Sequence, residues 1–287
     1  MIDCWYNKAK LAIAGCLLAG ATVDAGEHRV VSWRQVSDRS LSPLASSVMR
    51  EARRTWTHAE SARFIYHVAD ATMLEQVVEE TEWVCNAVGE RLGLADADEK
   101  GRLFLFSSAP AWDEMIHNTG RRSKGAGLNI GREIYVLRDP EQSERYVDIA
   151  HEMVHFRLQQ AYGDDLPLWL EEGLAEWLGW EVAAAYQLSR GLRLYRESRP
   201  TVPPESALTW PELMNVEQYP AEKDRNRAFY RQSRRLIDFL APHVAEGDWT
   251  RLIEEVTAAQ GDLEAVLRRS YDWSEARIDA MKAHVTD

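Results

Sequence analysis

Apolar residues recur at two different spacings along the chain, and each spacing predicts a different kind of element. In the first half, alternating or short continuous apolar runs predict β-strands at residues 63–69, 102–107 and 133–137. Apolar residues three and four positions apart predict helices at residues 41–57, 72–92 and 111–117. Strands mixed with helices in this order indicate an α+β fold.

Helical spacing dominates the second half of the chain. Amphipathic helices are predicted at residues 224–242, 249–259 and 273–285, and we expect the last two to close the fold as a helical hairpin. A proline-rich break at residues 197–204 precedes this part, because neither a helix nor a central strand tolerates it. We expect a helical lead-in over residues 26–62 and one domain over residues 63–287, with lobes at 63–180 and 205–287.

Composition limits the partners that the chain can bind. Its 287 residues carry 46 acidic and 34 basic side chains, a formal net charge of −12. Neutralising the phosphates of a nucleic acid needs a basic surface, and only short basic clusters occur, at residues 121–124 and 231–235. We therefore expect no nucleic-acid partner.

The N-terminus has the pattern of a secretory signal peptide over residues 1–25. Lys8 and Lys10 precede a mostly apolar stretch at residues 11–23 that is too short for a membrane span. An alternative is a lipoprotein signal, in which Cys16 ends a lipobox and carries the lipid anchor. We expect a periplasmic or extracellular protein without a stable membrane span after cleavage. Cleavage would leave Cys85 alone, within a helical apolar pattern that predicts a buried thiol.

The candidate chemistry begins with the run His-Glu-Met-Val-His at residues 151–155. On a helix, His151 and His155 share one face and can bind one metal ion, with Glu152 beside it. A metal held by three protein ligands keeps a position for water, and Glu152 can act as general base as that water attacks a carbonyl group. The run also arises by chance in acidic helices, so a second signal is needed.

A second helix supplies that signal. Asp165 is a predicted N-cap with Pro167 in the first turn, and Glu172 and Glu176 then share one helix face. Glu172 can be the third metal ligand, and Glu176 can accept the free ring N–H of a ligating histidine. Gly173 predicts a close approach to the first helix. The alternative is a solvated acidic face without a metal.

These two runs resemble the gluzincin zinc metallopeptidases, most closely small peptidase domains with a Trp-Leu-x-Glu-Gly-Leu-Ala-Glu helix. The resemblance is specific over residues 148–178. It implies a zincin-like fold, one Zn²⁺ on His151, His155 and Glu172, and Glu152 as general base. A segment similar to the family's Tyr-x-Gln-Ser implies Tyr230 as a donor to the reaction's oxyanion, although a core aromatic is the alternative. The Gly-x-Met-Glu-Asn signature of large aminopeptidases is missing, which argues against aminopeptidase specificity.

We therefore expect an exported zinc metallopeptidase that cleaves a peptide or protein substrate. Such a substrate would pair with an edge strand, either the one around Ile134 or the glycine-rich segment at residues 125–131; the alternative is a hairpin that binds no ligand. His117 is expected to be an exposed structural histidine. A zinc-stabilised binding or scaffold protein of the same fold is the alternative function. The sequence carries no signal for cleavage specificity or oligomeric state.

Overall fold

The structure is a computed structural model that describes residues 27–51, 55–96, 99–119, 125–138, 146–194, 203–244 and 248–286. The predicted signal peptide, with Cys16, and the basic cluster at residues 121–124 lie outside the described residues. Within the described ranges, no helix combines the length and the apolar character needed to cross a membrane.

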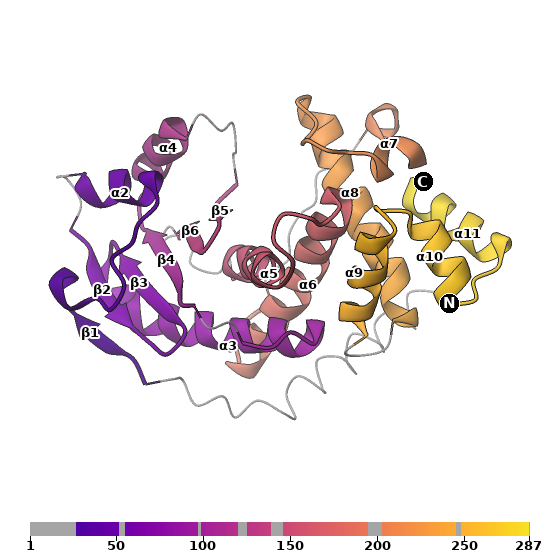
Figure 1. The fold of residues 1–287 in the computed structure, drawn as a ribbon. Helices are drawn as coiled ribbons and strands as arrows, with labels where there is room; N and C mark the ends of the chain where they lie inside the picture. The colour runs from indigo at the N-terminus through magenta and orange to yellow at the C-terminus, as the bar shows by residue number, and fades with distance from the viewer. Residues whose placement is uncertain are drawn as a thin grey trace.

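Six strands form one mixed sheet on one side of the molecule (Figure 1). The strands are β1 (Arg29–Val31), β2 (Thr57–Glu60), β3 (Phe64–Val68), β4 (Gly101–Phe106), β5 (Gly127–Ile130) and β6 (Glu133–Leu137). Their spatial order is β1-β2-β3-β4-β6-β5; the β3–β4 and β4–β6 pairs are parallel and the others antiparallel. With the helices below, this sheet confirms the α+β prediction.

Helices cover both faces of the sheet, because successive side chains of its central strands point to opposite sides. In β4, Leu103 and Leu105 pack toward α3 (Leu74–Leu92) and α5 (Val147–Tyr162). Phe104 and Phe106 belong to a second cluster that includes residues of α2 (Pro43–Arg50) and α4 (Ala109–Asn118). The central strands are thus buried on both faces, which explains their continuous apolar runs.

The N-terminal lead-in is only partly helical, so the prediction for residues 26–62 was wrong. In the described part of this segment, α2 and a short 3-10 helix at Trp33–Gln35 are helical, while β1 and β2 join the sheet. β2 pairs with strands on both sides, and it buries His58 and Glu60. Polar residues in a buried strand break the apolar alternation, and the strand could not be recognised from the pattern.

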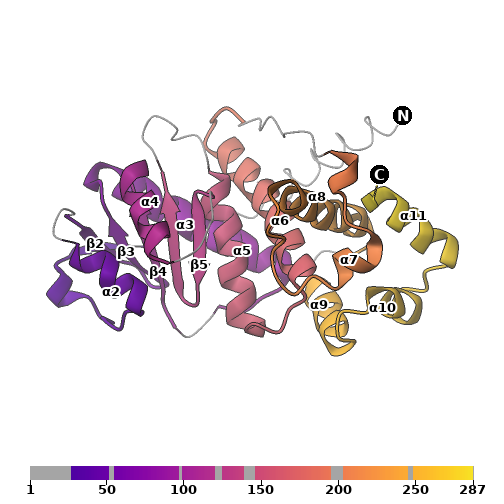
Figure 2. The same ribbon diagram turned by 90° about the horizontal axis from the view of Figure 1, so that it is seen from above.

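The remaining helices form an all-helical lobe beside the sheet (Figure 2). They are α6 (Leu168–Ser189), α7 (Trp210–Met214), α8 (Lys223–Leu240), α9 (Trp249–Ala258), α10 (Leu263–Ser270) and α11 (Glu275–Thr286). The predicted hairpin of the last two helices was wrong, because α10 lies between α9 and α11, and α11 packs on α8. The α10 helix begins with the side chain of Asp262 accepting the backbone N–H of Ala265, a cap that the apolar pattern does not reveal.

One hydrophobic core joins the two lobes. It runs without interruption from Ala59 in β2 to Val285 in α11. Its centre is the packing of α5 against α6 and of α6 against α8. The sheet and the helical lobe are therefore a single folded unit rather than separate domains.

Two glycines of α6 set the distance to its neighbours. A Cβ atom on Gly173 would lie 2.7 Å from the backbone oxygen of Ser233 in α8, so the predicted approach of Gly173 to the first helix was wrong. Gly179 has that role instead, because its Cβ would lie 3.0 Å from the Cα of His151 in α5. The two glycines let α6 approach a helix on each side.

We expect Gly173→Ala to lower the free energy of unfolding by about 1–3 kcal/mol, the usual cost of overpacking a core. The added Cβ atom clashes with the backbone of α8, which cannot easily move. This clash costs more than the roughly 1 kcal/mol that alanine gains over glycine from its higher helix propensity. Urea denaturation measures the difference. Leu188→Ala is the control, since Leu188 lies in the same helix and is 41% exposed. A Gly173→Ala protein as stable as wild type would contradict this packing.

Candidate metal centre

Helices α5 and α6 bring three potential metal ligands to one point. His151 and His155 lie one turn apart on α5, and their Nε2 atoms are 3.1 Å apart. The Oε2 atom of Glu172, on α6, lies 3.7 Å from Nε2 of His151 and 3.5 Å from Nε2 of His155. The structure thus places together the three residues that the sequence selected as ligands.

The spacing of these atoms fits a tetrahedral metal ion. Ligand atoms at zinc distances of about 2.1 Å stand roughly 3.4 Å from each other when the geometry is tetrahedral. Oε2 of Glu172 is buried and has no hydrogen-bond partner. Burying a carboxylate oxygen that accepts no hydrogen bond is costly, and a cation between it and the two imidazoles would offset that cost. The residues present therefore fit a metal ion, and two imidazoles with one carboxylate suit zinc.

Glu152 lies on α5 next to the ligands and is only 8% exposed. Its side chain packs against β5, where a Cβ atom on Gly127 would lie 2.6 Å from Cγ of Glu152. Burial raises the pKa of Glu152, although the nearby His151 and His155 act in the opposite direction. A carboxylate with a raised pKa is suited to accepting and returning a proton.

Glu171 makes a hydrogen bond to one histidine of the candidate metal centre. Oε1 of Glu171 lies 2.8 Å from Nδ1 of His155. Glu176 stands near the other ring, with Oε1 3.6 Å from Nδ1 of His151, which is too long for a hydrogen bond. Glu171 thus stands at Nδ1 of His155, and Glu176, the predicted residue, stands at Nδ1 of His151. In the sequence, the contact between Glu171 and His155 was indicated only by the position of Glu171 directly before Glu172.

Charges within the cluster shift the pKa values of its members in opposite directions. Burial lowers the pKa of His155, but Glu172 and Glu171 outweigh it and raise that pKa well above its usual value. Burial raises the pKa of Glu172, but His155 and His151 outweigh it and lower that pKa. Without a metal, the structure thus favours a protonated His155 beside an ionised Glu172.

Tyr230, on α8, lies among the carboxylates of this cluster. Burial raises its pKa, and the charges of Glu172, Glu176 and Glu152 raise it further. A phenol with a raised pKa keeps its proton and remains a hydrogen-bond donor. Tyr230 thus lies beside the candidate ligands as a protonated hydrogen-bond donor.

Tyr219 is a site residue that the sequence analysis missed. It lies between α7 and α8, and its hydroxyl donates a short hydrogen bond to Oε1 of Glu172. Its ring stacks on that of Tyr230, with centroids 6.0 Å apart and an angle of 15° between the rings. Tyr219 belongs to no helix or strand, so no periodic pattern indicated where its side chain lies.

The edge of the sheet near the metal ligands is β5. Of the two predicted edge segments, the strand around Ile134 is β6, which lies between β4 and β5. The glycine-rich segment contains β5, whose Gly127 packs against Glu152. The edge strand is therefore next to the candidate base.

Three other predictions concern residues outside the site. Cys85 is buried as predicted, and burial raises its pKa to about 11. His117 is exposed, as predicted. In the basic cluster at residues 231–235 we expected solvated side chains on an amphipathic helix, but Arg234 is buried and lies over the ring of Trp180.

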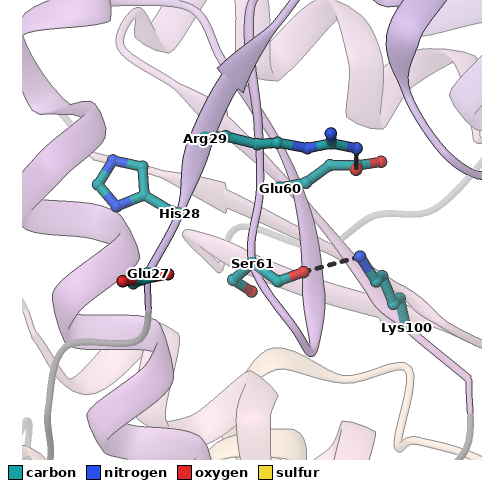
Figure 3. Close-up of a pocket in the computed structure, with 6 residues that line it drawn as sticks. All are labelled: Glu27, His28, Arg29, Glu60, Ser61 and Lys100. Carbon is teal, nitrogen blue, oxygen red and sulfur yellow. Dashed lines mark hydrogen bonds and ion pairs between the residues drawn. The ribbon is translucent and has the colours of Figure 1, made fainter.

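A hollow of roughly 360 Å³ lies elsewhere, between β1 and the end of β2 (Figure 3). Three of the charged side chains that line it have partners. Arg29 forms a 3.0 Å ion pair with Glu60, and Lys100 donates to the backbone oxygen of Ser61 at 2.7 Å. The hollow contains none of the predicted site residues, and we assign it no role.

We expect Glu171→Ala to weaken zinc binding by about 10–100-fold, the usual effect of removing a hydrogen bond to a ligating histidine. Glu176→Ala is a matched control: the two side chains are 30% and 28% exposed, and both variants lose one negative charge. Competition with a chromophoric chelator measures both affinities. An equal or larger loss in Glu176→Ala would contradict the assignment of Glu171.

Comparison with known proteins identifies no relative: no protein-family model matches the chain, and no curated protein matches its sequence. The likeness to gluzincins therefore rests on the motifs within residues 148–178 and on the geometry described above.

Proposed function

We propose that this protein is a zinc-dependent peptidase of the gluzincin type with a zincin-like fold. The observation that carries the proposal is the meeting of His151, His155 and Glu172 in metal-binding geometry. Glu152, a buried carboxylate beside them, supports catalysis rather than a purely structural metal site. A structural zinc site needs no base next to its ligands.

Each residue of the site has a distinct role in this proposal. When bound, zinc polarises the scissile carbonyl group and increases the acidity of a water molecule. Glu152 takes the proton of the attacking water and can return it to the leaving amine. Tyr230 donates a hydrogen bond to the oxyanion that forms at the carbonyl carbon.

The proposed substrate is a peptide in extended conformation. β5 is an edge strand, so its outer backbone groups have no neighbouring strand within the described sheet. An extended peptide can bind such an edge through backbone hydrogen bonds, largely independently of its side chains. Contact between Gly127 and Glu152 would bring the paired peptide next to the base.

We expect Glu152→Gln to retain zinc and to lose peptide hydrolysis by at least about 10²-fold, because the amide cannot accept the proton from water. Zinc content by mass spectrometry and cleavage of a defined peptide library measure the two effects. Glu90→Gln, an exposed change on α3, is the control.

The outcomes separate the peptidase from the alternative scaffold function. A Glu152→Gln protein as active as wild type would overturn the proposed mechanism. A wild-type protein that melts when zinc is removed but cleaves no peptide would favour a scaffold stabilised by metal.

We expect the stabilisation by zinc to shrink as the pH falls, because the metal must displace the proton that Glu172 and Glu171 help His155 to retain. In the metal-free protein, His155 contributes to the pH dependence of stability in the opposite direction. Since the folded pKa of His155 is raised, its contribution to stability is present below the unfolded pKa of about 6.5 and is lost as the pH rises through the folded value. The difference in Tm with and without zinc, between about pH 5.5 and 8, measures the effect.

Two variants check that the pH dependence comes from the site. His117→Ala, at an exposed position, should leave it unchanged. His155→Ala should remove most of the zinc stabilisation at every pH. A zinc stabilisation that is constant across this pH range would argue against histidine ligation.

A further inference from the structure

The two oxygen atoms of Glu172 have different surroundings. Oε1 accepts the hydrogen bond from Tyr219, whereas Oε2 faces both imidazoles and has no hydrogen-bond partner. Glu172 is only 2% exposed. Tyr219 holds one oxygen of a deeply buried carboxylate and leaves the other directed at the histidines.

We infer that Tyr219 is a positioning residue that makes Glu172 bind the metal through a single oxygen. This inference rests on the metal centre of the proposed function. A carboxylate can bind a metal through one oxygen or through both. With Oε1 engaged by the hydroxyl of Tyr219, Oε2 is the atom available to the metal.

The number of oxygens that bind matters for the proposed chemistry. A catalytic zinc site has three protein ligands and keeps the fourth position for water. If both oxygens of Glu172 bound, the second would compete for that position. The hydrogen bond from Tyr219 thus keeps a position available at the metal.

The same ring contacts the candidate oxyanion donor. Tyr219 stacks on Tyr230 and meets Phe229 edge-on, with a centroid distance of 6.2 Å to the latter. Tyr219 therefore touches both the third metal ligand and Tyr230. The hydroxyl contacts both Glu172 and Tyr230, whereas the ring stacks on Tyr230, so a change to phenylalanine removes the hydroxyl contacts and keeps the ring stacking.

The test compares wild type with Tyr219→Phe in zinc affinity and in the spectrum of the Co²⁺-substituted protein. We expect about 10–100-fold weaker zinc binding in the variant, as for other lost hydrogen bonds to metal ligands. We also expect weaker visible absorption of bound Co²⁺, because the absorption falls as the number of ligands rises above four. Tyr271→Phe is the control, since the hydroxyl of Tyr271 is buried without a partner.

Each result has a separate meaning. Equal zinc affinity and equal Co²⁺ spectra in wild type and Tyr219→Phe would overturn the role of Tyr219 and leave the metal centre intact. A Tyr219→Phe protein that is unfolded without metal would also overturn it, because the hydroxyl would then support the fold. Absence of zinc binding in wild type would overturn both this inference and the proposed function.

Discussion

The close packing of α5 against α6 is the constraint on which the rest of the site depends. Gly179 allows it, because any side chain there would meet the backbone of His151. Two ligands come from one helix and the third from the other, so a small change in separation would move Glu172 away from both imidazoles. Gly173 fixes the opposite side of α6 against α8, which carries Tyr230. The helix packing thus decides the site geometry before any metal binds.

This arrangement places several ionisable groups where solvent is scarce. Glu152, His155 and Glu172 are each less than 9% exposed. Removing charges from water costs several kcal/mol per group unless each finds a partner. In the metal-free protein, the pairing of His155 with Glu172 offsets part of that cost. The hydrophobic core around α5 and α6 stabilises the fold against the rest of it. Such concentrations of buried charge are typical of functional sites.

The sequence was sufficient for some parts of this site and insufficient for others, for physical reasons. The pairing of His151 with His155 follows from helical periodicity alone, and Glu172 follows from its place on a second helix. Whether Glu171 or Glu176 reaches a histidine depends on how the two helices cross, which no local pattern encodes. Tyr219 is outside any periodic element, and β2 hides its strand character behind buried polar residues. Local regularity was predictable, whereas contacts set by tertiary packing were not.

For the proposed peptidase, the contact between Gly127 and Glu152 has a consequence for where a bound peptide would be cut. Glu152, the proposed base, rests directly on the backbone of the edge strand rather than on a loop. When a peptide pairs with β5 in a given register, Glu152 therefore always lies beside the same residue of that peptide. Sliding the peptide by two residues would keep the same side chains facing the sheet and present a different bond. The register of the peptide on β5 would then determine which bond is cut.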